Sequence, residues 1–508
     1  MSSLLVGIDI GTSSVKSLIM NSSGQIMGLA QQEYDIQIPK AGYAEQDPAV
    51  WWRLTCDTLK QAMRQAGAKD ADISGIGFSG QMHGLVAVDE SGQVLRPAII
   101  WCDQRTIPQK EALESALSVE QLGALIQNPV ATGFQLLSLL WIKEHEPLIY
   151  RNIRKVMSPK DYVRYRMTGE IASEMTDASG TAAFSPASRE WSRRLLEAVD
   201  VDPELFPAVQ EPWKHSGTVT RQAAEESGLA KGTPVVYGGA DQPMQAIGNG
   251  IIHPGTISCT IGTGGQLFAP IDAPVYDPLL RSHSYVHAFP CRWYLLGATM
   301  SAGLSLKWLA NQILGETDYR LLDEKASTIP AGSEKLLFLP YLTGDRTPHM
   351  DPYAKGIFFG LTLKHSGAHM VRAVMEGVAF SLRDSLEIFH SLGVDAKKII
   401  VSGGGAKSAL WSQMLADILE QDVYASRMTE QACVGAALIA GVGVGQFDSI
   451  EQGIAQVVQI HEEPIRPQGR NRDVYRQQYE VYRALYDANQ RLFLELESPD
   501  NKNEGVIQ

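Results

Sequence analysis

Two aspartates are placed where a carboxylate could do chemistry. Asp9 interrupts the apolar run VGIDIG, and Asp241 follows the strand-like run TPVVYGGA. A carboxylate in an apolar strand is costly unless it binds a cation or joins a hydrogen-bond network. Mg²⁺ prefers such oxygen ligands while it bridges phosphates. Both aspartates are therefore candidate metal-binding residues, although Asp241 could instead cap the helix that QPMQAIGNG would form.

Two glycine-rich turns could surround phosphate groups. They lie at residues 11–14 (GTSS) and 262–265 (GTGG). Glycine allows close approach of the backbone, and the hydroxyl groups add hydrogen-bond donors. Each turn could equally be a plain β-hairpin connection. The candidate phosphate-binding residues in and beside these turns are Gly11, Thr12, Ser13, Lys16, Thr260, Gly262, Thr263 and Gly264.

A third glycine cluster, Gly403, Gly404 and Gly405, lies between the strand-like IIVS and the helix-like WSQMLADILEQ. Three glycines at such a junction leave room for a flat ring or a ribose against bare backbone, and a tight turn is the alternative. The chain has no GxxxxGK[ST] sequence and no HRD and DFG pair, which excludes a P-loop and a protein kinase.

The segment Gln81-Met82-His83-Gly84 joins two further strand-like runs in SGIGFSGQMHGLVAV. An imidazole and a thioether suit a polyol that presents one polar edge and one C–H face. Without a family context, a packed core histidine and methionine would be the first choice.

The elements that must position these residues alternate along the chain. Short apolar runs that end in glycine-rich turns alternate with amphipathic stretches, a pattern that indicates an α/β protein. The predicted strands include residues 4–10, 74–80, 95–101, 233–239, 255–262, 334–342 and 397–405, and the predicted helices include residues 48–67 and 369–393.

One similarity suggests an internal repeat. LVGIDIGTSSVKSLIM at residues 5–20 and TISCTIGTGGQLFAP at residues 256–270 share a strand, a Gly-Thr turn and a second strand. Two halves that open with the same hairpin suggest duplicated domains that face each other across a cleft. The turn residues of GNGIIHPG predict a boundary near residues 249–254.

Composition narrows the function further. The 508 residues contain 44 Lys and Arg against 57 Asp and Glu, a formal net charge of −13, which argues against nucleic-acid binding. The N-terminus lacks the features of a signal peptide, and no apolar run is long enough to span a bilayer. Five widely spaced cysteines are typical of a reduced chain. We therefore expect a cytoplasmic protein that has neither a nucleic-acid nor a membrane partner.

The ordered set of motifs resembles the FGGY carbohydrate kinases, members of the actin-like ATPase superfamily. The matching pieces cover about residues 4–445 in the family's order, a combination far more specific than any single piece. They include GIDIGTSSVK, PAIIWCDQRT, KDYVRYRMTGE, TDASGT, GGADQ, CTIGTGG, LPYLTGDRTPHMDPYAKGIFFGLT, AVMEGVAFSLRD, VSGGGAKSALWSQMLADIL and QACVGAALIAG.

The resemblance implies two actin-like (ribonuclease H-like) α/β domains around a central cleft. These would be a sugar-binding domain at residues 1–248 and a nucleotide-binding domain at residues 249–490, followed by a polar tail at 491–508. It also implies ATP and Mg²⁺ as cofactors and a small sugar as the partner. A homodimer is a family expectation.

The resemblance also assigns roles to residues. Asp241 would be the general base and Asp9 would hold Mg²⁺ through water, while the two Gly-Thr turns would bind the phosphates. Gly403–Gly405 would flank the adenosine. The residues expected to line the sugar are Met82, His83, Asp241 and Gln242, with Trp101 and Asp103 close by.

The expected reaction is ATP-dependent phosphorylation of D-xylulose to D-xylulose 5-phosphate, a step of pentose catabolism, because GQMHG looks like the sugar-contacting segment of family members that phosphorylate xylulose. Gln242 stands where many of those members have Asn, so ribulose or gluconate is the alternative substrate. A more distant alternative is an actin- or chaperone-type ATPase switch, which would use the same hairpins.

Overall fold

The computed structural model describes residues 3–497, which form two compact units. The first unit comprises the chain through Ile252 together with residues 270–294 and 427–459. The second comprises residues 253–269, 295–426 and the chain from Ile460 onward. Both units are therefore discontinuous in sequence, whereas the predicted division into 1–248 and 249–490 is continuous. That division stays a prediction about how the sequence is organised.

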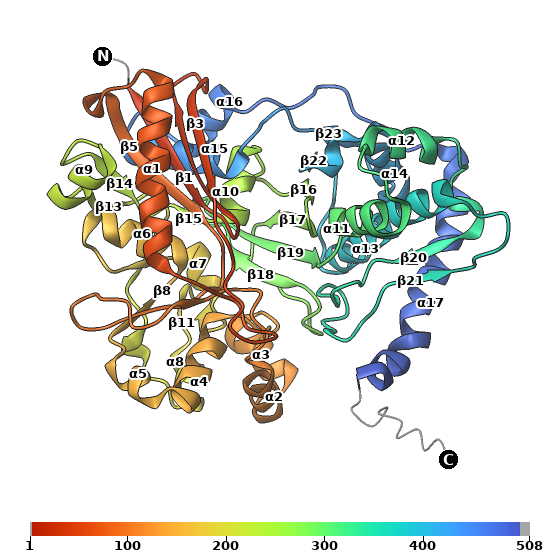
Figure 1. Ribbon diagram of the computed structural model, residues 1–508, viewed down its shortest axis with the longest axis horizontal. Coiled ribbons are helices and arrows are strands. Elements are labelled where there is room, and N and C mark those ends of the chain that lie inside the picture. Colours follow the sequence, from red (N-terminus) through yellow and green to blue (C-terminus); the bar gives the residue numbers. More distant parts are fainter. Residues whose placement is uncertain (1–2, 498–508) are drawn as a thin grey trace. The chain divides into compact units, whose positions relative to one another are not determined.

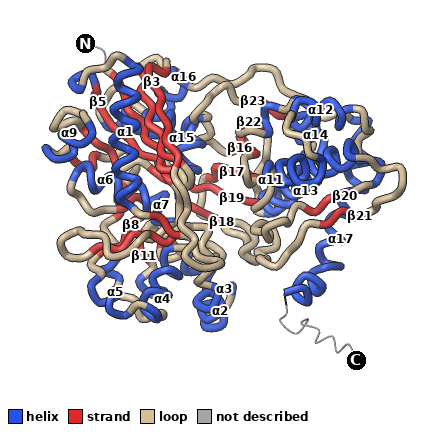
Figure 2. Tube along the Cα trace, viewed as in Figure 1, coloured by secondary structure: helices blue, strands red, loops and turns tan. Residues whose placement is uncertain are grey.

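The first unit is built on a mixed sheet that contains the first predicted hairpin. Its strand order is β13-β14-β5-β1-β2-β3, with β15 paired to β5 as well (Figures 1 and 2). The central strand β1 (Leu4–Ile10) pairs antiparallel with β2 (Ser14–Met20) and parallel with β5 (Ile73–Gly80). The strand predicted at residues 4–10 is confirmed, as is the hairpin that follows it.

Helices cover both faces of this sheet. Successive side chains of β1 point to opposite faces, so each face contributes apolar side chains to a different cluster. Val6 and Ile8 belong to the apolar cluster of α1 (Pro48–Ala66), and Leu5 belongs to that of α15 (Gln431–Gly443). Gly7 also faces α15, since a Cβ there would lie 1.9 Å from the carbonyl oxygen of Cys433. Asp9 is two residues further along, so it projects from the face that α15 covers.

The second unit repeats this arrangement. Its sheet includes β19, β17, β16, β22 and β23, which are hydrogen-bonded to one another in that order. The strand β16 (Thr256–Ile261) pairs antiparallel with β17 (Gly265–Ile271) and parallel with β22 (Lys398–Ser402). In the first unit, β1 pairs in the same two ways, antiparallel with β2 and parallel with β5. The repeat predicted from two Gly-Thr turns is therefore present as a repeated strand arrangement.

The remaining elements have the following bounds. In the first unit they are β3 (Ile26–Glu33), β4 (Glu45–Gln46), β6 (Val86–Val88), β7 (Ala98–Ile99), α2 (Ile107–Ala116), α3 (Val119–Ile126), α4 (Gln135–His145), α5 (Pro147–Asn152), β8 (Lys155–Met157), α6 (Pro159–Thr168), β9 (Ser173–Glu174), α7 (Met175–Ser179), β10 (Phe184–Ser185), β11 (Glu190–Trp191), α8 (Arg193–Ala198), β12 (Val209–Gln210), β13 (His215–Thr218), α9 (Arg221–Ser227), β14 (Pro234–Val236), β15 (Gly239–Ala240), α10 (Asp241–Gly248), β18 (His283–Val286) and α16 (Ile450–Val457). In the second they are β19 (Trp293–Thr299), α11 (Gly303–Trp308), α12 (Tyr319–Ser327), β20 (Leu337–Leu339), β21 (Ile357–Phe359), α13 (Gly367–Ser391), α14 (Ala409–Leu419), β23 (Val423–Ala425) and α17 (Arg472–Glu497).

Several elements differ from their predicted extent. The strand expected over residues 334–342 is reduced to β20 at residues 337–339, and the strand expected over residues 233–239 is interrupted between β14 and β15. The strand expected over residues 95–101 is reduced to the two residues of β7. Residues 491–497, expected to begin a polar tail, continue α17, where the buried Phe493 packs near Tyr486. Residues 498–508 of that tail lie outside the described part of the chain.

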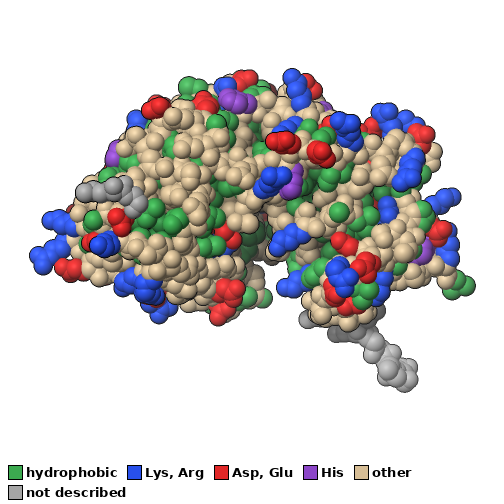
Figure 3. Space-filling view, turned by 90° about the horizontal axis from the view of Figure 1, so that it is seen from above, with side chains coloured by type: hydrophobic (Ala, Val, Ile, Leu, Met, Phe, Trp, Pro, Cys, Tyr) green, Lys and Arg blue, Asp and Glu red, His purple; other side chains and the backbone are tan. Residues whose placement is uncertain are grey.

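Basic and acidic side chains are interspersed over the face shown in Figure 3. No helix within residues 3–497 combines the length and the apolar character needed to cross a bilayer.

Candidate functional site

The first unit contains a small polar cavity of about 280 Å³ that brings the two predicted aspartates together. Asp9 comes from the end of β1 and Asp241 from the first turn of α10. The N-terminal end of α15 forms another wall. The lining residues are Asp9, Lys16, Asp241, Gln242, Gln245, Glu430, Gln431 and Ala432.

Asp9 is held by a neighbouring strand. It pairs in register with Ser79 of β5, and the Ser79 hydroxyl donates a hydrogen bond of 2.7 Å to Asp9 Oδ1. Burial raises the pKa of Asp9, whereas the Ser79 hydrogen bond and the charge of Lys16 lower it. The hydrogen-bond network predicted as one explanation for a carboxylate in this strand is therefore present.

Asp241 has the properties of a proton acceptor that works near neutrality. Burial, and then the negative charge of Asp9, raise its pKa from 3.8 to about 7. Its Oδ1 accepts a hydrogen bond of 2.7 Å from the backbone N–H of Gln242. General bases are most effective when their pKa lies near the working pH, so this carboxyl group could remove a proton from a bound hydroxyl.

Lys16 reaches the cavity but is engaged there. Its Nζ lies 2.6 Å from Oε2 of Glu430, the residue that precedes α15. The ammonium predicted to add charge at a phosphate therefore has a carboxylate partner within the same wall. Glu430, Gln431 and Gln245 were not expected at the site.

The donor set fits Mg²⁺ only in part. Among residues 3–497, no three His, Cys, Asp or Glu side chains gather closely enough to hold a metal ion by themselves. Asp9 and Asp241 supply two carboxylates to one cavity. Because Mg²⁺ keeps several waters in proteins, two carboxylates could supply the protein part of its coordination.

Met82 and His83 lie in the connection between β5 and β6, and both are buried. His83 has a left-handed backbone (φ 72°), which is uncommon for a residue other than glycine. Its Nδ1 lies 2.6 Å from the carbonyl oxygen of Gly180, and its ring stacks on Phe134 with centroids 4.1 Å apart. Since a carbonyl can only accept, Nδ1 is assigned the proton. A Cβ on Gly180 would lie 2.9 Å from Met82 Cε and 3.1 Å from His83 Nδ1, so Gly180 packs directly against both side chains.

Trp101 is tied to the first Gly-Thr turn. Its indole Nε1 donates to Thr12 Oγ1 at 2.8 Å, while the side-chain amide of Gln46 donates to the Thr12 carbonyl at 2.7 Å. Within the turn itself, the Gly11 amide donates to the Ser14 carbonyl, and the Ser13 carbonyl accepts from the amide of Tyr34. The turn is thus a hairpin connection braced by side chains from elsewhere in the unit.

Asp103 has a different environment from the other sugar-site candidates. Its side chain is fully buried, forms an ion pair of 2.8 Å with Arg105 and accepts the backbone N–H of Ala44. Its oxygens therefore serve protein donors. Gln242, by contrast, lines the cavity beside Asp241.

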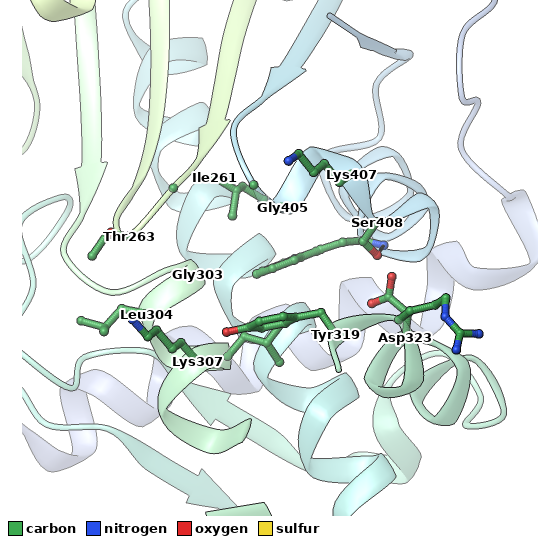
Figure 4. A pocket seen from close by; sticks show the side chains of 15 residues that line it. Ile261, Thr263, Gly303, Leu304, Lys307, Tyr319, Asp323, Gly405, Lys407 and Ser408 are labelled. Carbon is green, nitrogen blue, oxygen red and sulfur yellow. Dashed lines mark hydrogen bonds between the residues drawn. The ribbon is translucent and has the colours of Figure 1, made fainter. Parts of the chain in front are cut away.

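The second unit contains a larger pocket of about 630 Å³ (Figure 4). Gly262 and Thr263 of the β16–β17 turn lie along it, as do Gly404 and Gly405 after β22. The other lining residues are Ile261, Gly303, Leu304, Leu306, Lys307, Tyr319, Arg320, Asp323, Lys407, Ser408 and Trp411.

Three predicted residues support this pocket without lining it. Thr260 shares a hydrogen bond of 3.0 Å with the Ser402 hydroxyl and so joins the two strands that lead to the pocket. Gly403 has φ 84°, and a Cβ there would lie 2.5 Å from the Ile261 carbonyl. A Cβ on Gly264 would lie 2.7 Å from the Thr299 carbonyl. Both glycines are required by close backbone contacts.

The opposite wall of the pocket was missed by the sequence analysis. Tyr319 and Asp323 come from α12, and Figure 4 shows Asp323 beside Ser408. Burial raises the pKa of Asp323, and a hydrogen bond from Ser408 opposes that rise. Ser408 and Trp411 lie within the matched motif VSGGGAKSALWSQMLADIL, whereas α12 carries no motif that would have indicated a role.

Comparisons with known proteins cover both units. Residues 4–248 match the N-terminal domain, and residues 257–444 the C-terminal domain, of the FGGY family of carbohydrate kinases. The chain is 35% identical over 494 residues to a xylulose kinase from Bacillus subtilis (strain 168), which covers 97% of this chain and 99% of that protein.

Solved structures show the same similarity. The crystal structure of a xylulose kinase from Rhodospirillum rubrum matches with a TM-score of 0.89 and 29% identity, over 96% of this chain and 99% of that one. A gluconate kinase from Lactobacillus acidophilus matches with a TM-score of 0.92 over 98% and 100% of the two chains. At 24% identity, this second likeness concerns the fold alone.

Proposed function

Because this chain belongs to the FGGY family of carbohydrate kinases, we propose that it transfers the γ-phosphoryl group of ATP to the terminal primary hydroxyl of D-xylulose. The product would be D-xylulose 5-phosphate. The observation that carries the proposal is the carboxyl group of Asp241, whose pKa is raised to about 7 in a cavity that it shares with Asp9. The xylulose kinases among the relatives support the choice of sugar.

Asp241 would act as the general base. A sugar hydroxyl is far too weak an acid to be ionised before it attacks, so the carboxylate would orient the hydroxyl and take its proton late in the transfer. Asp9 and Asp241 would hold Mg²⁺, which supplies charge neutralisation at the phosphates.

The sugar would be recognised by Met82, His83 and Gln242. The contact between its Nδ1 and the Gly180 carbonyl orients the His83 ring, which would give the sugar a polar edge to contact. The Met82 thioether offers an apolar contact for the C–H face of the sugar. Gln242 is placed beside the base by its position in α10.

The nucleotide would occupy the pocket of the second unit. The turn at Gly262 and Thr263 would receive phosphates, and the bare backbone of Gly404 and Gly405 would lie against the nucleoside. Tyr319 adds an aromatic surface to that pocket. The proposal places the enzyme in the cytoplasm; a homodimer stays a prediction.

A panel of sugars tests this function. ADP release would be coupled to a spectroscopic assay with D-xylulose, D-ribulose, gluconate and glycerol in turn. We expect kcat/KM to be highest for D-xylulose. Higher kcat/KM for ribulose or gluconate would leave the kinase activity in place and overturn the substrate. ATP hydrolysis that no sugar stimulates would favour an ATPase switch instead.

A further inference from the structure

The buried segment from Glu174 to Gly180, which includes the short helix α7, touches both parts of the proposed sugar site. At its C-terminal end, the Gly180 carbonyl accepts a hydrogen bond from His83. Near its N-terminal end, the Thr176 hydroxyl contacts the backbone of Ala240, which directly precedes Asp241. One short segment therefore supports residues that come from two distant parts of the sequence.

The hydrogen bonds of Thr176 have a fixed direction. The backbone N–H of Ala240 can only donate, and it lies 2.8 Å from Thr176 Oγ1. The hydroxyl oxygen therefore accepts this bond, and its own proton is donated to Glu174 Oε1, also at 2.8 Å. Thr176 is fully buried, so water does not replace either bond in the folded protein.

Glu174 is itself firmly held. It caps α7 by accepting the backbone N–H groups of Thr176 at 2.7 Å and Asp177 at 2.8 Å. The buried Lys160 lies 3.4 Å from the same carboxylate. Lys160 in turn packs under β5, since a Cβ on Gly80 would lie 2.9 Å from Lys160 Cβ. The acceptor behind the Thr176 hydroxyl is thus part of a rigid, buried ionic cluster.

The strand that leads to Asp241 is short, and Thr176 is one of its neighbours together with β5 and Met244. Strand β15 consists of Gly239 and Ala240, and it pairs with Ser79 and Gly80 of β5. Neither residue has a side chain beyond Cβ. A Cβ on Gly239 would lie 3.1 Å from Thr176 Oγ1, so the hydroxyl is in close contact with both residues of the strand.

We propose that Thr176 is a positioning residue for the base: its hydroxyl, oriented by Glu174, holds the Ala240 amide and thereby sets where the Asp241 carboxylate meets the sugar hydroxyl. The inference rests on the proposed function. A base must lie within hydrogen-bond reach of the proton that it removes, and a displacement of about 1 Å can cost 10²-fold in rate. Because the other contacts to the sugar remain, loss of the Thr176 hydroxyl should lower kcat while the KM for the sugar changes little.

The test compares three variants with the full-length enzyme. Thr176→Val removes the hydroxyl at nearly constant volume, and Thr176→Ser retains it. Thr181→Val is the matched control, because the buried Thr181 hydroxyl likewise donates one hydrogen bond (here to the Ala178 carbonyl, 2.6 Å) and accepts one from a backbone N–H (Ala183, 3.1 Å). We expect Thr176→Val to lower kcat about 10- to 100-fold with a sugar KM within about threefold of wild type. Thr176→Ser and Thr181→Val should keep kcat within about threefold.

Several results would overturn the inference. They are a Thr176→Val kcat close to wild type, an equal loss of kcat in Thr181→Val, and a Thr176→Ser variant as slow as Thr176→Val. Melting temperatures identify loss of fold, and if Thr176→Val does not fold, Thr176→Ala takes its place with the same expected kcat. Wild-type enzyme that phosphorylates no sugar of the panel would refute the proposed function, whereas an active wild type with an unaffected Thr176→Val would refute only the positioning role.

Discussion

The two pockets differ in the kind of group that makes them. The cavity of the first unit is lined by charged and amide side chains, with Asp9, Asp241, Lys16 and Glu430 among them. The pocket of the second unit owes much of its wall to glycines at the ends of strands and to apolar side chains. The first is suited to move a proton and hold a cation, and the second is suited to accommodate the shape of a ligand. Both units contain the same kind of hairpin, so the difference between the two pockets comes from the other residues that line them.

The strongest test of this contrast removes the base from the first unit. Asp241→Asn keeps the shape and much of the hydrogen bonding of the side chain but cannot accept a proton. We expect kcat to fall about 10²- to 10⁴-fold, while sugar binding in the absence of nucleotide survives. Steady-state kinetics and calorimetric titration with sugar measure the two effects. A kcat within a few-fold of wild type would remove Asp241 from the mechanism.

A second test fills the pocket of the second unit. Gly404 has a right-handed helical backbone (φ −62°), and a Cβ there would meet no atom within 4 Å. Gly404→Leu should therefore fold, occupy the space proposed for the nucleoside and raise the KM for ATP about tenfold or more. The control is Gly469→Leu, at an exposed glycine outside the pocket where a Cβ is equally free of contacts. Unchanged ATP kinetics in Gly404→Leu would mean that the nucleotide binds elsewhere.

The smallest expected effect concerns a buried acid that is not in a site. Burial raises the pKa of Asp384, on α13, from 3.8 to about 7. The charge of Glu387 also raises this pKa, whereas the charges of Arg483 and Arg383 lower it. A hydrogen bond of 2.6 Å from Tyr479 lowers it as well. Between pH 3.8 and 7 the folded state binds this proton and the unfolded state does not. The contribution of Asp384 to the free energy of unfolding is therefore fully present below pH 3.8 and is lost as the pH rises to 7.

Asp384→Asn should remove that pH dependence. The unfolding free energy of wild type should fall between pH 4 and pH 8 by about 2–4 kcal/mol more than that of the variant. Urea denaturation at several pH values measures the difference, and kcat at the pH optimum should change little. Parallel curves for the two proteins would show that Asp384 is ionised in the folded state at all these pH values.

Much of this organisation is predictable because it is local in sequence. The hairpins at residues 5–20 and 256–270 and the long helices follow from apolar periodicity and glycine turns, and the two-domain actin-like α/β fold that the motif order implied is confirmed by the family match. What escaped prediction depends on contacts between distant residues. Lys16 and Glu430 are 414 residues apart, and nothing in the hairpin sequence indicates that partner.

The same limit applies to the pocket of the second unit. Glycines that must be glycine for steric reasons stand out in a sequence, whereas Tyr319 and Asp323 are ordinary residues of an amphipathic helix. Asp103 was selected by its motif, yet burial commits it to Arg105. The motifs therefore predicted the glycine-rich turns of each pocket better than the side chains that line the rest of it.

The return of α15 to the first unit has a consequence for how the protein is made. During synthesis, a chain that has reached residue 252 already contains Asp9 and Asp241, but not the helix that covers the face from which Asp9 projects. Gly248 of α10 and Gly435 of α15 allow the two helices to approach each other so closely that each added Cβ would lie 2.0 Å or less from a carbonyl oxygen of the other. The first unit can thus reach its final packing only after residues 431–443 have left the ribosome. Until then the growing chain exposes an apolar sheet face that is a natural target for chaperones.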